Sequence, residues 1–262
     1  MRVAVAGAAG RMGQAIIAAM REAGGGDKAL QLGAALEAAG NPSLGKEVWG
    51  VKIGSDVGAA LAAADLLVDF TRPEATLAHL RACKAQAKSM VIGTTGFSAA
   101  QKKEIEEAAR AVPVVMAANF AVGVNALFRL AETAARILGE GYDVEIIEAH
   151  HRQKVDAPSG TALRLGEVLA KALDRKLAEV ERHGRHGEPG ARPAREIGFH
   201  AVRGGDIVGE HTVLFAGTGE RLELTVRSQS RATYAAGALR AARWLQGRKP
   251  GLYDMQDVLG LR

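Results

Sequence analysis

The densest group of chemically capable side chains lies in residues 148–161, which read EAHHRQKVDAPSGT. The imidazoles of His150 and His151 and the ammonium of Lys154 could donate protons or hold an anionic ligand. The residues after the proline, which we expect to open a helix, are Ser159, Gly160 and Thr161. A helix N-terminus with hydroxyl side chains binds carboxylate or phosphate well. The segment therefore predicts a site for an anionic substrate that needs a proton.

Two other interpretations of residues 148–161 stay open. His150 and His151 could bind a metal ion, but neighbouring side chains on a strand point to opposite faces. Because no third ligand stands at metal spacing, we predict no metal. The segment could also be a capped turn with a purely structural role. The remaining histidines are expected to be non-catalytic: His79, His183, His186, His200 and His211.

A glycine-rich turn near the N-terminus forms a second candidate site. Residues 7–13 read GAAGRMG, between an apolar run at 3–6 and a helical pattern at 14–23. Glycine in such a turn lets a pyrophosphate approach the backbone at a helix N-terminus. The spacing differs from the usual G-x-G-x-x-G, so the prediction of dinucleotide binding depends on the strand before the turn and the helix after it. The alternative is a turn that only packs the helix.

Glu37 ends the second predicted strand, where a ribose-binding carboxylate belongs. It would accept hydrogen bonds from the ribose of NAD and repel the 2′-phosphate of NADP, and Arg11 could offset that repulsion. Three polar segments also follow predicted strands and could line the nicotinamide half of the site: Phe70-Thr71-Arg72, Gly93-Thr94-Thr95 and Ala118-Asn119-Phe120. In doubly wound sheets, ligands bind beyond the carboxyl ends of the strands.

The elements that would position these residues alternate along the first 120 residues. Strands are expected at 3–6, 30–36, 66–70, 90–92 and 114–116, with helices at 14–23, 71–87 and after residue 98. Thr71 with Glu74, and Ser98 with Gln101, have the spacing of capping boxes. Residues 41–54 are rich in glycine, proline and serine and indicate a loop. The alternation predicts βαβ units and a parallel sheet.

The pattern changes after residue 119. Helices are expected at about 123–138, 159–173 and 233–245, with a strand at 143–149. Three runs joined by tight turns, 196–202, 207–216 and 221–228, predict an antiparallel meander. The fold class is therefore α/β: a Rossmann-like doubly wound parallel sheet, plus a smaller α+β domain with a mixed or antiparallel open sheet.

Composition limits the class of protein. The 262 residues are 48% hydrophobic and 24% charged, with a net charge of +5, as in ordinary globular proteins. Cys83 is the only cysteine, which excludes an intrachain disulfide. No apolar run reaches the roughly 18 residues of a membrane span, and we expect a cytoplasmic protein without a membrane partner. The basic stretch 175–195 has no aromatic residues for base stacking, so we expect no nucleic-acid partner.

Residues 148–162 closely resemble the signature of the 4-hydroxy-tetrahydrodipicolinate reductase family, long called dihydrodipicolinate reductases. Further segments are similar to that family, in the same order along nearly the whole chain: 68–73, 93–97, 118–120 and 204–211. The resemblance implies an oxidoreductase of diaminopimelate and lysine biosynthesis that uses NADH, NADPH or both. A cyclic 4-hydroxy dicarboxylate would lose water, and the resulting unsaturated ring would be reduced to tetrahydrodipicolinate.

The resemblance also implies residue roles. His150 would be the proton donor, and Lys154 would donate or polarise at the ring while it holds a carboxylate. His151 and the helix start, Ser159, Gly160 and Thr161, would hold the substrate carboxylates. The implied cofactor set comprises Gly7, Ala8, Ala9, Gly10, Arg11, Met12, Glu37, Phe70, Arg72, Gly93, Thr94, Thr95, Ala117, Ala118, Asn119 and Phe120. Ala38 stands where some members carry arginine, which favours dual cofactor use tilted toward NADH.

Domain organisation and assembly follow from the same resemblance. Residues 1–121 and 232–262 would form the dinucleotide-binding domain, and residues 122–231 the domain for substrate binding and oligomerisation. The expected assembly is a homotetramer in which the sheets of the second domain pack together. Two rival functions are another nicotinamide-dependent dehydrogenase of a small dicarboxylate or amino acid, and a dinucleotide-sensing or nucleic-acid-binding regulator that uses the basic stretch.

Overall fold

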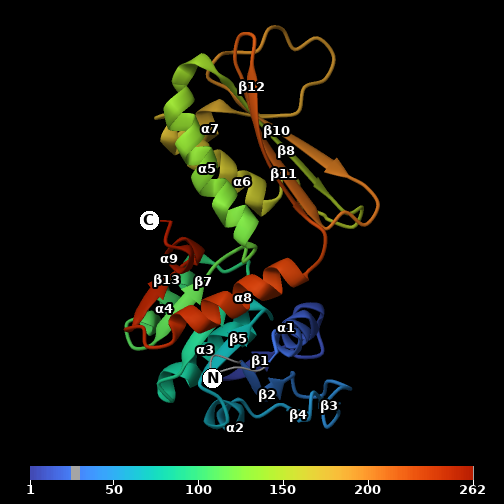
Figure 1. The fold of residues 1–262 in the computed structure, drawn as a ribbon, viewed down its shortest axis with the longest axis vertical. Helices are drawn as coiled ribbons and strands as arrows, with labels where there is room; N and C mark the ends of the chain where they lie inside the picture. Colours follow the sequence, from blue (N-terminus) through green and yellow to red (C-terminus); the bar gives the residue numbers. More distant parts are fainter. Residues whose placement is uncertain (25–29, 262) are drawn as a thin grey trace. The chain divides into compact units, whose positions relative to one another are not determined.

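The structure, a computed structural model, describes residues 1–24 and 30–261. Two compact units make up the chain (Figure 1). The first unit combines Met1–Val122 with Arg231–Arg262, and the second comprises Gly123–Ser230. Within the described residues, no helix has the length and apolar character needed to cross a membrane.

The first unit is built on an eight-stranded sheet with the order β13-β7-β6-β5-β1-β2-β4-β3. Its strands are β1 (Arg2–Ala6), β2 (Gln31–Leu36), β3 (Glu47–Val48), β4 (Val51–Gly54), β5 (Leu66–Asp69), β6 (Ser89–Ile92), β7 (Pro113–Met116) and β13 (Gly251–Tyr253). Its helices are α1 (Arg11–Glu22), α2 (Val57–Ala62), α3 (Pro73–Ala85), α4 (Ala99–Ala109), α8 (Ala232–Leu245) and α9 (Met255–Leu259). All pairs are parallel except β3 with β4, which confirms the doubly wound sheet.

Helices cover both faces of this sheet, and the sequence of β1 shows why. Val3 and Val5 belong to the apolar cluster that α1 and α8 complete, whereas Ala4 and Ala6 belong to the cluster of α2, α3 and α4. Side chains alternate between the faces of a strand, so a strand buried on both faces must be apolar at every position. The strand order reverses at β1, which lies between β2 and β5. Ligands bind beside such a switch point in doubly wound folds.

Two local predictions in the first unit are wrong. The expected loop at 41–54 contains the hairpin of β3 and β4, whose turn residues Trp49 and Gly50 have φ values of 47° and 73°. Positive φ at both turn positions matches a tight hairpin, but the residues that usually indicate such a turn are asparagine, aspartate and glycine, and Trp49 is none of these. Thr71 does not cap α3, whose N-cap is Arg72 without a side-chain hydrogen bond. The Thr71 hydroxyl donates instead to Asp69. The capping box of Ser98 and Gln101 is confirmed.

The second unit carries a five-stranded sheet with the order β12-β11-β8-β10-β9. Its strands are β8 (Asp143–His150), β9 (Glu181–His183), β10 (Ile197–Arg203), β11 (Gly209–Ala216) and β12 (Arg221–Ser228). Its helices are α5 (Val122–Leu138), the 3-10 helix η1 (Gly139–Gly141), α6 (Gly160–Ala172) and α7 (Leu177–Val180). Residues of α5 and α6 pack on one face of the sheet (Figure 1). The other face leaves apolar side chains exposed, including Ile147 and Val202.

The predicted antiparallel meander is wrong in its first pairing. β10 does not pair with β11; it lies on the other side of β8 and runs parallel to it. The chain reaches β10 from β8 through α6 and α7, and such a crossover returns a strand in the same direction. β11 is antiparallel to both β8 and β12, so only the second turn of the expected meander joins paired strands.

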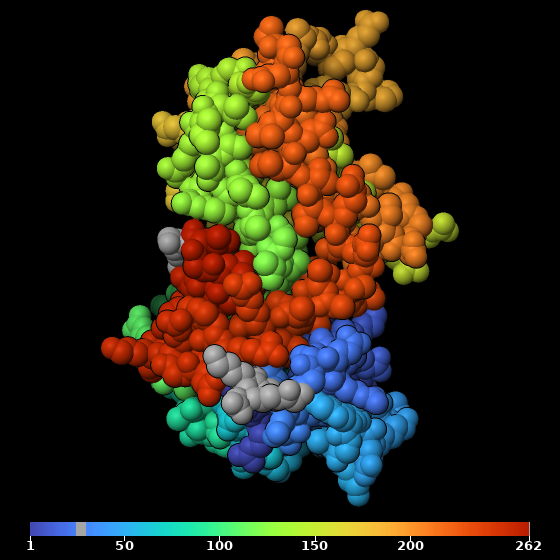
Figure 2. Space-filling view, in the orientation of Figure 1, coloured from blue at the N-terminus to red at the C-terminus, as the bar shows by residue number. Residues whose placement is uncertain are grey.

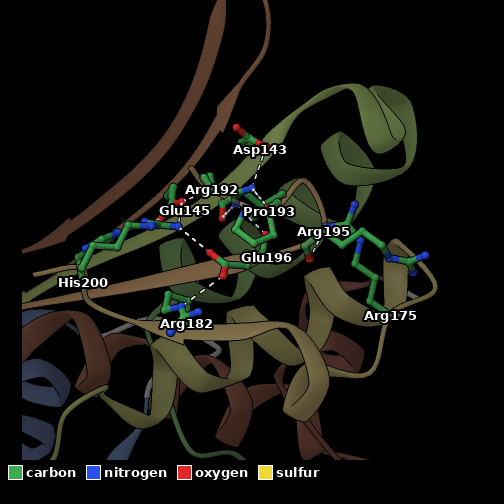
Figure 3. Close-up of polar contacts among 11 residues, drawn as sticks. Asp143, Glu145, Arg175, Arg182, Arg192, Pro193, Arg195, Glu196 and His200 are labelled. Atoms are coloured by element: carbon green, nitrogen blue, oxygen red, sulfur yellow. Dashed lines mark hydrogen bonds and ion pairs between the residues drawn. The ribbon is translucent and has the colours of Figure 1, made fainter. Parts of the chain in front are cut away.

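The basic stretch 175–195 is largely exposed, but arginines bind it to the sheet (Figure 3). Arg192 donates to the carboxylates of Asp143 and Glu145 and to backbone carbonyl groups. Arg185 pairs with Glu145 and Glu196. The gold loop in Figure 2 is this segment. Arg185 and Arg192 of this segment are therefore engaged with carboxylates of the same unit.

Candidate active site

The predicted acid, His150, is the last residue of β8. Glu148 lies two positions earlier and therefore points to the same face of the sheet. The Nδ1 atom of His150 is 2.6 Å from Oε2 of Glu148, and the Glu148 side chain is only 1% exposed. A buried carboxylate thus orients the imidazole of the residue expected to donate a proton.

Arg203, on the neighbouring strand β10, binds the same carboxylate of Glu148. The register places Arg203 of β10 opposite His150 of β8. Its Nη1 and Nη2 atoms each lie 2.7 Å from one oxygen of Glu148, a bidentate pair. Nη2 also donates to the carbonyl oxygen of Asp156 at 2.6 Å. Arg203 therefore joins β10, Glu148 and the loop after β8.

Ser159 begins α6 at the same place, as predicted. Its hydroxyl accepts from the N–H of Ala162 at 3.2 Å, which confirms Ser159 as the N-cap. Its own N–H donates to Oε1 of Glu148 at 3.1 Å. Gly160 follows at the first helical position, exposed and with open space around its α-carbon, and Thr161 comes next. The helix start and His150 are thus connected through one carboxylate.

His211 also belongs to this cluster, although this was not predicted from the sequence. It lies on β11 and is 4% exposed, with Nε2 3.0 Å from the hydroxyl of Ser159. Its ring meets that of His150 edge-on at 5.1 Å. Burial, reinforced by the positive charge of a protonated His150, lowers the pKa of His211 to about 4. The available signal was its inward position on β11, in alternation with the apolar Val213 and Phe215.

Burial and hydrogen bonding act in opposite directions on the two central groups. Burial opposes ionisation of Glu148, but hydrogen bonds from Arg203, His150 and the N–H of Ser159 hold its pKa below the ordinary value. Burial also lowers the pKa of His150, against the raising influence of Glu148. Glu148 is therefore an ionised acceptor at neutral pH, and His150 is readily deprotonated.

Lys154 and His151 lie in the loop between β8 and α6. The Lys154 Nζ atom is 2.8 Å from both carboxylate oxygens of Asp156, and this pairing lowers the pKa of Asp156. The carbonyl oxygen of His151 accepts the N–H of Lys154 at 3.0 Å. The Nδ1 atom of His151 is buried without a hydrogen-bond partner. The structure thus gathers all six predicted catalytic and substrate-binding residues at the end of β8 and the start of α6.

The predicted cofactor residues all belong to the first unit, at carboxyl ends of its strands. They follow β1 (Gly7, Ala8, Ala9, Gly10, Arg11 and Met12), β2 (Glu37), β5 (Phe70 and Arg72), β6 (Gly93, Thr94 and Thr95) and β7 (Ala117, Ala118, Asn119 and Phe120). Because β5, β1 and β2 are neighbours, with β6 and β7 beyond β5, these segments share one edge of the sheet.

The glycine turn fits a pyrophosphate at the helix start. Gly7 has a φ of +68°, which favours glycine, and a Cβ on Gly13 would lie 2.1 Å from the carbonyl oxygen of Gly7. Gly10 is the N-cap of α1, and no side chain caps the helix. The first turn of α1 contains no acidic residue. The helix dipole and its free N–H groups are therefore available to an anion.

Glu37 stands directly beside this turn. Its Oε1 atom accepts from the N–H of Ala9 at 2.9 Å, and Oε2 accepts from Asn41 Nδ2 at 2.9 Å. The N–H of Ala38 also donates to Oε2, at 3.4 Å, so about one of the four lone-pair positions of the carboxylate is left for a further donor. This geometry suits a carboxylate that contacts a ribose next to the pyrophosphate.

A second buried network stands at the ends of β5 and β6. Asp69 is fully buried and accepts from the Thr71 hydroxyl at 2.6 Å, while its other oxygen lies 2.6 Å from His79 Nδ1. The Thr76 hydroxyl joins Asp69 to Thr94. Neither Asp69 nor a role for His79 was predicted from the sequence. The network fixes the loops after β5 and β6, which carry predicted cofactor residues.

Aromatic packing defines the adjoining part of this edge. The rings of Phe70 and Phe120 lie 5.4 Å apart, and a Cβ on Gly93 would lie 2.0 Å from the Phe70 ring. Only glycine therefore fits between β6 and this phenylalanine. In the described residues, no group of three histidine, cysteine or acidic side chains could hold a metal ion.

Comparison with known proteins identifies the family. The model of the dihydrodipicolinate reductase N-terminus matches residues 1–120, and that of the C-terminus matches residues 123–259. The chain belongs to the dihydrodipicolinate reductase family. A 4-hydroxy-tetrahydrodipicolinate reductase of Nitrosomonas europaea is 58% identical over 100% of this chain and 99% of its own length. One of Aromatoleum aromaticum is 57% identical over 100% and 96%.

Solved structures support the fold of this reductase family member. A dipicolinate-bound dihydrodipicolinate reductase from Paenisporosarcina sp. TG-14 has a TM-score of 0.79 and 26% identity, covering 98% of each chain. A probable dehydrogenase from Thermotoga maritima has a TM-score of 0.65 at 11% identity, over 100% of this chain and 93% of its own. This second likeness concerns the fold alone.

Proposed function

We propose that this chain is a 4-hydroxy-tetrahydrodipicolinate reductase of diaminopimelate and lysine biosynthesis. The cyclic 4-hydroxy dicarboxylate loses water, and the unsaturated ring takes up one hydride and one proton to give tetrahydrodipicolinate. The full-length match to reductases of this name, at 58% identity, carries the proposal. The cluster of His150, Glu148 and the α6 start supports it with a proton donor beside an anion site.

His150 serves as the proton donor, and Lys154 donates or polarises at the ring while it holds a carboxylate. The lowered pKa of His150 makes its protonated form a stronger acid than an ordinary imidazolium. Lys154 is 21% exposed and paired with the exposed Asp156, a partner that a substrate carboxylate can replace. His211, whose pKa is lowered to about 4, is neutral at pH 7 and therefore does not compete with Lys154 for the substrate carboxylate.

The substrate carboxylates bind at His151 and at the start of α6. The exposed Gly160 and the neighbouring Thr161 present a helix N-terminus whose dipole favours negative charge. The buried, unpartnered Nδ1 of His151 is a polar group that a ligand can satisfy. A dicarboxylate needs two anion sites, and this loop offers a helix start and the cation Lys154.

The first unit binds NADH or NADPH. Residues 7–12 hold the pyrophosphate, Glu37 the adenosine ribose, and the loops after β5, β6 and β7 the nicotinamide half. When bound, the reduced nicotinamide supplies the hydride. The uncapped start of α1 and the Gly13 backbone contact support this assignment. Glu37 disfavours a 2′-phosphate, whereas Arg11, exposed at the start of α1, attracts one, so we propose dual use tilted toward NADH.

The second unit carries substrate binding and oligomerisation, in a cytoplasmic homotetramer. The exposed Ile147 and Val202 on the uncovered sheet face, and the exposed side chains of β12 (Figure 2), support an association surface there. The pairing of Arg185 and Arg192 with carboxylates argues against a nucleic-acid partner.

Cofactor oxidation tests this function directly. Substrate is made in situ from pyruvate and aspartate semialdehyde by the preceding synthase, and NADH and NADPH are compared side by side. We expect rapid oxidation that requires the synthase, faster with NADH. Failure to oxidise either cofactor, in folded protein that binds NADH, would contradict the proposal and favour a dehydrogenase of another small dicarboxylate or amino acid.

A further inference from the structure

Glu148 accepts four hydrogen bonds, which come from His150, Arg203 and Ser159. His150 Nδ1 and Arg203 Nη1 meet its Oε2 at 2.6 and 2.7 Å, and Arg203 Nη2 and the Ser159 N–H meet its Oε1 at 2.7 and 3.1 Å. A carboxylate offers about four lone-pair positions, so none is left for a ligand. Glu148 therefore does not contact substrate itself.

The chemistry of the carboxylate determines which imidazole nitrogen carries the proton. Because Glu148 is paired with Arg203, it is ionised and can only accept hydrogen bonds. The 2.6 Å contact with Nδ1 then requires that Nδ1 of His150 is the donor. In neutral His150 the other nitrogen, Nε2, is unprotonated, and it is the one that gains and releases a proton.

We propose that Glu148, held in place by Arg203, is a positioning residue that keeps the His150 proton on Nδ1, reserves Nε2 for proton exchange and couples the imidazole to the start of α6. The inference rests on the proposed role of His150 as the proton donor. Since the same carboxylate holds the Ser159 N–H, any shift of Glu148 moves the proton donor and the anion-binding helix start together.

The charged and titratable groups around His150 come from every neighbouring element. Glu148 lies on its own strand, Arg203 on β10, His211 on β11 and Lys154 in the following loop. Glu148 raises the pKa of His150, while Lys154 and Arg203 lower it. Removal of the Glu148 charge must therefore lower the pKa of His150, and removal of the Arg203 charge must raise it.

The first experiment needs no variant. Nitrogen-15 NMR of the ligand-free protein, with His150 assigned by its loss in His150→Gln, reports the protonation of both ring nitrogens. We expect protonated Nδ1 and unprotonated Nε2 above the pKa. The opposite tautomer would overturn the proposal, and this result stands apart from the reductase assay because it requires no turnover.

Variants then separate positioning from stability. In Glu148→Gln we expect the His150 titration to move to lower pH, and in Arg203→Gln to higher pH. The kcat of Glu148→Gln should fall at least ~10-fold, but by no more than the ~10²–10⁴ that a positioned acid contributes, and KM for NADH should stay within about twofold. The matched control is Glu145→Gln, on the same strand and also bound by arginines and a histidine. This control variant should leave the pH of the His150 titration unchanged and kcat within about twofold of the wild type.

A purely structural Glu148 gives a different pattern. Both Glu148→Gln and Glu145→Gln would then lower the unfolding temperature, and the His150 titration would move in neither. That outcome contradicts the proposal, as does a shift of the same sign in Glu148→Gln and Arg203→Gln. Absence of reductase activity in the wild type would instead reject the proposed function, whatever the titrations show.

Discussion

Two glutamates on β8 bind partners of nearly the same types, but these partners come from different parts of the second unit. Glu145 accepts from Arg185 in bidentate fashion, from Arg192 and from His200, and Glu148 accepts from Arg203 in bidentate fashion, from His150 and from a backbone N–H. They lie three positions apart and therefore on opposite faces of the sheet. Figure 3 shows the Glu145 cluster, which holds the loop of residues 184–196.

The difference lies in which histidine nitrogen each carboxylate takes. Glu145 engages Nε2 of His200, whereas Glu148 engages Nδ1 of His150. The fourth donor also differs, since Arg192 completes the Glu145 set and the start of α6 completes the Glu148 set. The same side-chain types thus form a loop anchor in one place and, next to a helix N-terminus, the proposed proton-transfer site in the other.

The largest effect on this contrast is expected when the histidine of each cluster is replaced by glutamine. His150→Gln and Lys154→Ala should each reduce turnover by ~10²-fold or more, because a positioned acid is lost. NADH binding, followed by fluorescence titration, should persist in both. His200→Gln is the matched control and should retain turnover within about twofold. Near-normal turnover in His150→Gln would remove the functional distinction between the two clusters.

Acid unfolding tests the anchoring role of Glu145. Its arginine and histidine partners overcome burial and lower its pKa to about 2, so its ionised form stabilises the folded state above the ordinary value of about 4.3. This contribution, up to about 3 kcal/mol, is lost as pH falls through about 2. Urea unfolding should give Glu145→Gln a lower free energy of unfolding than the wild type at pH 7, and this difference should shrink toward pH 3. A difference that does not change with pH would contradict the stabilising role of ionised Glu145.

His211 makes the Glu148 cluster sensitive to acid in another pH range. Its pKa is lowered to about 4 in the folded protein, so between pH 6.5 and 4 His211 is protonated in the unfolded chain but not in the folded protein. Stability therefore falls as pH drops from 6.5 to 4, by up to about 3 kcal/mol. In His211→Gln the slope of unfolding free energy against pH should be shallower in this range. His186→Gln, at an exposed histidine, is the control variant.

The smallest expected effect compares two helix caps. Ser159→Ala and Ser98→Ala should each lower the unfolding free energy by about 1 kcal/mol, because each removes an N-cap hydroxyl. Only Ser159→Ala should also raise KM for the dicarboxylate substrate, since α6 starts at the proposed anion site. Equal substrate KM values in the two variants would place the anion elsewhere.

Local patterns made much of the fold predictable. The apolar run of β1, the glycine turn and the caps at Ser98 and Ser159 act within a few residues of each other, and each prediction was confirmed. The family signature gathered His150, Lys154 and the α6 start in one segment, and the structure keeps them together.

Non-local pairing explains what the sequence did not reveal. The position of β8 between β10 and β11 depends on which strand edges meet, and the tight turn at residues 203–206 suggested the wrong partner. Arg203 and His211 reach Glu148 and Ser159 from 55 and 52 residues away, so no local spacing predicts them. Thr71 has a cap's spacing, but its hydroxyl and its N–H both donate to the buried Asp69, and Arg72 is the N-cap of α3.

The return of the chain to the first unit has a consequence for its synthesis. Helix α8 completes the apolar cluster of Val3 and Val5, and β13 extends the sheet beyond β7, but both follow the whole second unit. At about 5–20 residues per second, residues 123–230 keep a ribosome occupied for roughly 5–20 seconds. During that interval the nascent first unit has one sheet face without α8. The part of the protein made first is therefore the last to be finished, and the second unit can fold before it.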